Sequence, residues 1–169
     1  ADVYRGKVKA ERSFFNLLLY LSMFPKMMQG PIVRYEQVAR QLMDRRTTPR
    51  AAFEGAQRFI IGLAKKVLLA DYAGKVVASL STGGGNGTFV GAWLAALMFM
   101  FQIYFDFSGY SDMAIGLGRI FGFRYCENFD LPYISTSITE FWRRWHMSLG
   151  SFFRDYVYIP LGGNRRGKA

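Results

Sequence analysis

The chain has 169 residues, of which 51% are hydrophobic, 17% aromatic and 20% charged, and its formal net charge is +10. This composition is apolar for a soluble domain but too mixed for a bundle of plain spanning helices. The positive charge suggests a nucleic-acid binder, yet the basic residues cluster beside apolar segments, as in the cytoplasmic flanks of membrane proteins. A single cysteine, Cys126, excludes an internal disulfide framework and is expected to be a small packing residue.

The N-terminal third alternates basic and apolar stretches. Residues 13–24 form an apolar run that Pro25 and Lys26 end, and a run of that length is too short to cross a bilayer unaided. The charged loop at residues 44–50 follows. Pro49 is well placed in the first turn of the next helix.

Residues 53–80 have helical spacing of apolar positions, but three charged residues interrupt them: Lys65, Lys66 and Asp71. If this segment enters a membrane, those charges must face protein or a wet cavity, because exposure to lipid costs about 2.5–3.5 kcal/mol for each.

A glycine-rich stretch at residues 83–87 predicts a hairpin turn, which we place on the outer side of a membrane. It is followed by residues 89–105, which carry no charge and one strongly polar side chain, Gln102. We therefore predict a spanning helix over residues 88–107. Lysine and arginine are dense at residues 34–50 and 143–168 and absent from residues 76–105, which predicts that the basic segments are cytoplasmic.

Two carboxylates, Asp106 and Asp112, close this apolar run. A polar turn between helices is the common interpretation in a soluble protein, whereas acids at the end of a spanning run are expensive and more often functional. We expect both to matter for function more than for folding. The nearby Gly116 and Gly118 resemble a dinucleotide fingerprint only superficially, since no strand precedes them.

Residues 139–163 read TEFWRRWHMSLGSFFRDYVYIPLGG and contain His146, the chain's single histidine. We predict an amphipathic helix over residues 138–158, capped by Ser137 or Thr139, with Glu140 completing a capping box with Ser137. On this helix His146 lies at the edge of an apolar arc, beside a gap with small and cationic residues. Desolvation would keep its ring neutral and able to act as a general base. The alternative is a packed boundary histidine.

Several stretches resemble the membrane-bound O-acyltransferase family, and within it the bacterial branch that acetylates polysaccharides such as alginate and peptidoglycan. One is FWRRWHMSL at residues 141–149, followed by RDY at 154–156 and IPLGGNR at 159–165. Others are YFDFSGYSDMAIGLG at 104–118 and ENFDLPYIS at 127–135. The phrase GPIVR at 30–34 is also similar, and in the family it precedes a cytoplasmic amphipathic segment, here residues 35–43.

The resemblance implies an all-α, multi-pass helical enzyme of the bacterial cytoplasmic membrane, with amphipathic and broken helices, of which residues 1–169 are one internal fragment. It implies transfer of an acyl group, in this branch acetyl, from a cytoplasmic thioester such as acetyl-CoA toward hydroxyls of an extracytoplasmic polysaccharide. A second, extracytoplasmic acetyltransferase is the expected partner protein. The family's other signature histidine lies downstream of this region.

His146 occupies the position of a family histidine implicated in acyl transfer and is the expected catalytic base. Supporting or substrate-channel roles are expected for nine residues: Asp106, Ser108, Tyr110, Asp112, Asn128, Trp142, Arg143, Trp145 and Asp155. Among these, an arginine or tryptophan beside His146 is a candidate oxyanion donor, and one of the aspartates is a candidate to orient the imidazole. We expect no bound cofactor, and a single histidine argues against a zinc site.

Two other functions stay open on sequence alone. A non-enzymatic membrane subunit that conducts an acyl group or hands it to a partner transferase predicts that His146 is dispensable. A soluble nucleic-acid binder predicts salt-sensitive binding, and the uncharged run at residues 76–105 argues against it.

Overall fold

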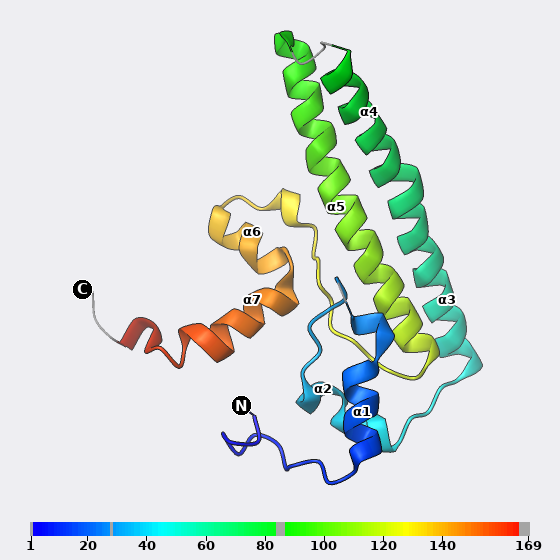
Figure 1. Ribbon diagram of the computed structural model, residues 1–169, viewed down its shortest axis with the longest axis vertical. Helices are drawn as coiled ribbons and strands as arrows, with labels where there is room; N and C mark the ends of the chain where they lie inside the picture. Colours follow the sequence, from blue (N-terminus) through cyan, green and yellow to red (C-terminus); the bar gives the residue numbers. More distant parts are fainter. Residues whose placement is uncertain (1, 28, 84–86, 166–169) are drawn as a thin grey trace. The chain divides into compact units, whose positions relative to one another are not determined.

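The computed structural model describes residues 2–27, 29–83 and 87–165 (Figure 1). Its regular elements are all helical, and no strand occurs among the described residues, which confirms the all-α prediction for that part of the chain. The chain divides into two compact units. Residues 47–121 form one unit, a helical hairpin with two limbs that we call the hairpin unit. Residues 1–46 with 122–169 form the second unit.

The first limb of the hairpin unit begins where local sequence signals predict it. Thr48 caps α3 (Pro49–Ala64), because its Oγ1 accepts a hydrogen bond from the backbone N–H of Ala51 at 3.2 Å. Pro49 occupies the first helical position, where a missing N–H costs nothing. The helix continues through a π-helical segment, η2 (Lys65–Ala70), into α4 (Asp71–Thr82).

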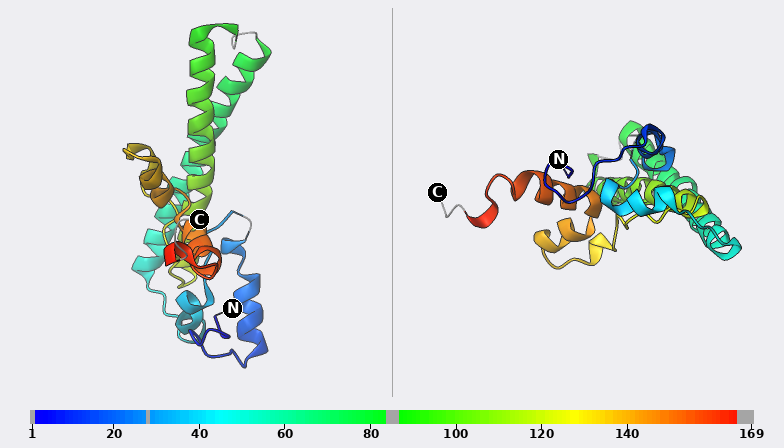
Figure 2. Two further views of the ribbon diagram at one scale, coloured as in Figure 1. Left: turned by 90° about the vertical axis from the view of Figure 1, so that its left-hand side faces the viewer. Right: turned by 90° about the horizontal axis from the view of Figure 1, so that it is seen from below.

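The second limb is a single helix, α5 (Phe89–Ile120), capped by Thr88. It lies beside α3, η2 and α4 along its length, as Figures 1 and 2 show. It is longer than the predicted span of residues 88–107, because the two acids continue the helix instead of ending it. Within the described residues it is the helix that is long and apolar enough to cross a membrane. Residues 84–86, in the predicted glycine turn, lie outside the described part.

Glycines bring the two limbs into close contact. A Cβ at Gly62 would lie 2.6 Å from the carbonyl oxygen of Gly109, and one at Gly55 would lie 2.7 Å from that of Gly116. Both distances are shorter than any real Cβ contact, so only glycine permits this approach of the backbones.

The charges inside the hairpin are paired across the limbs. Asp112 accepts hydrogen bonds from Arg58 at 2.8 Å and from Lys65 at 2.6 Å, and Lys66 pairs with Asp106. Lys65 and Lys66 thus contact carboxylates of the opposite limb, as expected, whereas Asp71, the third charge of the segment, is exposed. These partners also explain why α5 continues past its acids, since each carboxylate is neutralised by α3 or η2.

The second unit contains short helices around a small core. Ser13 caps α1 (Phe14–Ser22), η1 (Phe24–Lys26) follows it, and α2 is Tyr35–Met43, so the apolar run and the amphipathic segment noted in the sequence both form helices. The core side chains come from residues far apart in sequence: Met23, Val33, Val38, Leu42, Phe123 and Tyr125. The remaining elements are η4 (Pro132–Ile134), α6 (Ile138–Arg144), α7 (Met147–Phe153), the π-helical η5 (Arg154–Tyr158) and η6 (Gly163–Arg165).

Candidate functional site

His146 stands at a break between two short helices, so the prediction of one helix over residues 138–158 is wrong. Helix α6 ends at Arg144 and α7 begins at Met147, with His146 in the left-handed region at φ 45° and ψ 54°. A residue with a Cβ pays about 1–2 kcal/mol for that conformation. The side chains that a continuous helix would place beside His146 are therefore not its neighbours. The break between α6 and α7 determines what surrounds it.

The connector from Glu127 to Ser135 supplies hydrogen-bond partners on both sides of the break. The backbone N–H of Asp130 donates to the carbonyl oxygen of Arg144 at 3.0 Å. The N–H of Met147 donates to the carbonyl oxygen of Asn128 at 2.9 Å. The last turn of α6 and the first turn of α7 are thus both anchored to the same stretch of backbone.

A buried side-chain cluster continues this anchorage. The Oδ1 atom of Asn128 accepts hydrogen bonds from the backbone N–H of Ser148 at 3.3 Å and from its hydroxyl at 2.8 Å. The Ser148 hydroxyl in turn accepts from the N–H of Ile32 at 3.0 Å. Asn128 is 1% exposed and Ser148 4%. Three segments, near residues 32, 128 and 148, therefore meet beside His146.

Ser148 and Ile32 were missed as site residues by sequence reasoning. The available signal was weak: Ser148 is a small polar residue two positions after the histidine, in an otherwise apolar stretch. Its buried contacts reach residues 20 and 116 positions away.

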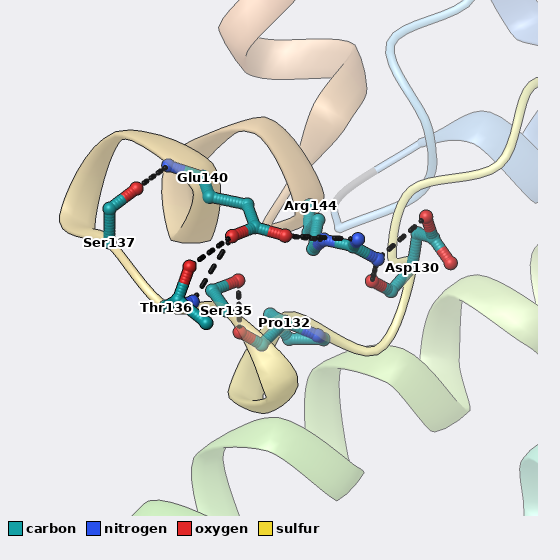
Figure 3. A network of polar contacts seen from close by, with 7 residues as sticks. All are labelled: Asp130, Pro132, Ser135, Thr136, Ser137, Glu140 and Arg144. Atoms are coloured by element: carbon teal, nitrogen blue, oxygen red, sulfur yellow. Dashed lines mark hydrogen bonds and ion pairs between the residues drawn. The ribbon is translucent and has the colours of Figure 1, made fainter.

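A polar network fixes the start of α6 (Figure 3). Ser137 caps the helix, as predicted, by accepting from the N–H of Glu140 at 3.1 Å. The Glu140 carboxylate returns to the N–H of Thr136, one residue before the cap, so the predicted capping box with Ser137 is corrected. Arg144 joins Glu140 at 3.0 Å to Asp130 at 3.2 Å, and so ties the helix to the connector.

The two tryptophans beside His146 differ in environment. The ring of Trp145 packs against three aromatic neighbours, with centroid distances of 5.0 Å to Phe129, 5.5 Å to Phe141 and 6.3 Å to Tyr133. Trp142 is 61% exposed. Of the two, Trp145 is the one whose packing supports the break.

The imidazole of His146 is partly buried, and its Nε2 atom is shielded from solvent. Burial lowers the pKa of His146 below its ordinary value of 6.5. The neutral form therefore dominates near pH 7, which a general base requires. Burial is the cause expected from the sequence.

The other predicted site residues have different settings. Asp155 pairs with Arg34 at 2.8 Å and with Arg154 at 2.9 Å, and these arginines lower its pKa to about 2. This geometry gives Asp155 a structural role, and its role in orienting His146 stays a prediction. Arg143 is exposed.

Four predicted residues belong to the hairpin unit: Asp106, Ser108, Tyr110 and Asp112. Ser108 is buried, and both aspartates take part in the ion pairs between the limbs. The two aspartates therefore have a structural role in the hairpin, in addition to the functional role that the sequence predicts for them.

A cavity of about 380 Å³ lies in the N-terminal segment and contains none of the predicted site residues. Its lining is Asp2, Val3, Val8, Ala10, Glu11, Leu17, Tyr20 and Tyr35. No cluster of three metal-ligating side chains occurs within residues 2–27, 29–83 and 87–165. Burial raises the pKa of the Cys126 thiol, in keeping with a packing residue.

Comparison with known proteins adds independent observations. The chain is 52% identical to a probable alginate O-acetylase of Pseudomonas syringae over 167 residues, which are 99% of this chain and 32% of that protein. It is 41% identical to a peptidoglycan O-acetyltransferase of Helicobacter pylori, covering 90% of the chain and 29% of that relative. A teichoic acid D-alanyltransferase of Bacillus subtilis is 31% identical, and the match covers 91% of this chain and 40% of that relative.

The chain thus spans about a third of the length of the alginate O-acetylase and the peptidoglycan O-acetyltransferase. The model of the membrane-bound O-acyltransferase family matches residues 8–169, which is nearly all of the sequence. The resemblance at residues 141–165 and the all-helical fold agree with that match. The chain therefore belongs to the membrane-bound O-acyltransferase family.

Proposed function

We propose that the protein containing this chain transfers an acetyl group from a cytoplasmic thioester, such as acetyl-CoA, toward hydroxyls of an extracytoplasmic polysaccharide. The observation that carries the proposal is the left-handed break at His146, where the imidazole is partly buried and burial lowers its pKa. Acyl transfer to a hydroxyl needs such a base. The names of the relatives support the substrate class, since they include an alginate O-acetylase and a peptidoglycan O-acetyltransferase.

In this proposal neutral His146 accepts the proton of the acceptor hydroxyl while its oxygen attacks the thioester carbonyl carbon. The tetrahedral intermediate then collapses, the carbon–sulfur bond breaks, and the leaving thiolate takes the proton from the imidazolium. A lowered pKa favours this cycle, because the imidazole is unprotonated before attack and acidic enough afterwards to release the proton.

We further propose that the protein lies in a bacterial cytoplasmic membrane as a multi-pass protein, with α5 as one span and His146 near the cytoplasmic side. Lysine and arginine are absent from residues 76–105 and frequent near both ends of the chain, which supports this orientation. Cysteines introduced at Asn86 and Ser151 of the full-length protein, in a Cys126→Ala background, test it. Labelling of both from the same side of the membrane contradicts the arrangement.

The partner in this proposal is an extracytoplasmic acetyltransferase that completes transfer to the glycan. The alternative function is a membrane subunit that conducts acyl groups without catalysing their transfer. The two differ in their need for the imidazole, because conduction through a channel requires no base.

The deciding experiment uses the full-length protein with His146→Gln, which keeps a hydrogen-bonding group but removes the base. Polysaccharide acetylation and acetyl-CoA consumption should both fall by about 10²- to 10⁴-fold. Ile138→Ala is the matched control, since it truncates an exposed side chain at the start of α6, outside the candidate site, and should leave transfer intact. Transfer at the normal rate by a well-expressed His146→Gln protein rejects the base and favours the conducting subunit.

A further inference from the structure

The left-handed backbone at His146 needs external support. It costs about 1–2 kcal/mol, and such conformations persist only where the surroundings determine them strongly. Helix α7 has seven residues, so its own hydrogen bonds give a weak hold on its direction. The direction in which His146 carries its imidazole therefore depends on what fixes the first turn of α7.

Asn128 is the residue that fixes this turn. It accepts three hydrogen bonds from the first two residues of α7: one at its backbone carbonyl from Met147, and two at Oδ1 from Ser148. The backbone N–H of Ser148 can only donate, so it sets which end of the amide faces α7. The link then continues through the Ser148 hydroxyl to the N–H of Ile32.

Packing alone does not account for an amide at position 128. Asn128 is 1% exposed, and among the described residues its Nδ2 group has no hydrogen-bond partner. Burying an unsatisfied donor costs about 1–3 kcal/mol, which an apolar side chain would avoid. The contribution that offsets this cost is the acceptor that Oδ1 presents to α7.

We propose that Asn128, acting with Ser148, is a positioning residue for His146 in the acyl transfer described above. The inference rests on the proposed function, because it assigns Asn128 the task of aiming the base. Without Oδ1, the Ser148 N–H loses its acceptor and α7 can rotate about the break. A displacement of about 1 Å in a reacting group can lower the rate by about 10²-fold.

The test compares Asn128→Ala, Asn128→Asp and Ser148→Ala in the full-length protein, with acetyl-CoA as donor and acetylated polysaccharide as readout. In Asn128→Ala, kcat per folded molecule should fall by about 10²-fold while KM for acetyl-CoA changes by less than about threefold. Asn128→Asp keeps an acceptor oxygen in either protonation state, so its kcat should be at least about tenfold higher than that of Asn128→Ala. Ser148→Ala keeps the N–H bond to Oδ1, so its kcat should fall less, by about tenfold.

The pH dependence separates positioning from folding. Because burial lowers the pKa of His146, an imidazole released toward water should titrate closer to 6.5. The acid limb of the kcat profile should therefore move to higher pH in Asn128→Ala. A purely structural role would reduce the amount of folded protein and leave the limb in place.

Each outcome decides the proposal. Unchanged kcat and an unchanged acid limb in folded Asn128→Ala protein overturn it. If Asn128→Ala does not accumulate, Ser148→Ala decides in the same way, and wild-type kcat with a wild-type limb rejects the positioning role. Normal transfer by His146→Gln removes the proposed function itself, whereas an inactive His146→Gln beside a fully active Asn128→Ala removes only the positioning role.

Discussion

The left-handed backbone at His146 makes an unusual prediction about stability. His146→Gly and His146→Ala remove the same imidazole, but they differ at φ 45°, where alanine keeps the strained Cβ and glycine does not. That strain is worth about 1–2 kcal/mol. Glycine loses about 0.5–1 kcal/mol more backbone entropy on folding. The glycine variant should therefore be the more stable of the two by about 0.5–1 kcal/mol.

Position 151 provides the matched control, because Ser151 lies inside α7 with ordinary helical backbone. There the order reverses, and the Ser151→Ala protein should be more stable than the Ser151→Gly protein by about 1 kcal/mol. The assay is the midpoint of thermal unfolding of full-length protein in detergent, and both His146 variants should lack acyl transfer. If alanine proves the more stable residue at 146 as well as at 151, the break is not left-handed. The support assigned to Asn128 then loses its basis.

Further predictions concern the hairpin, the exposed tryptophan and pH. Gly62→Ala places a Cβ 2.6 Å from a backbone oxygen of α5 and should lower stability by about 1–3 kcal/mol. Gly87→Ala is the control, because a Cβ there meets no atom within 4 Å and should leave stability unchanged. The yield of monodisperse protein in gel filtration measures both variants. Asp112→Asn leaves two cations without their carboxylate, so membrane protein level should fall in addition to the loss of acyl transfer that the sequence predicts for this acid. Trp142→Ala should change the unfolding midpoint little, because the ring is 61% exposed, in contrast to the cost expected for a buried tryptophan. The lowered pKa of His146 means that the unfolded state binds more protons below pH 6.5, so stability and kcat/KM should both decline as pH falls through that region and stay level between pH 7 and 8.

Features that depend on neighbours in sequence were predictable. Thr48 followed by Pro49 marks the start of α3, because a cap and a proline act within one turn. Ser137 caps α6 for the same reason. The continuation of α5 past Asp106 was not predictable, since it depends on cations of the opposite limb whose register no periodicity reveals.

The break at His146 was missed for a related reason. Apolar spacing on both sides of it fits a helical period, so the pattern alone favours one helix through the histidine. The bonds that stop the helix come from Asn128 and Asp130, 14 to 20 residues away from their partners. His146 could be selected as the candidate base from its type and the family resemblance. The geometry that makes it suitable could not.

Ion pairing in the hairpin extends the length of α5 that could lie within a bilayer. From Phe89, a bilayer core of about 30 Å corresponds to about 20 helical residues and ends near Gly109. The uncharged run ends sooner, at Asp106, whose carboxylate pairs with Lys66 of η2. Gln102, the strongly polar residue within the run, lies against Gly74 of α4, so its amide faces protein. The Asp106 carboxylate is therefore paired within the hairpin, and the Gln102 amide lies against the opposite limb, which reduces the polar surface that α5 would present to lipid.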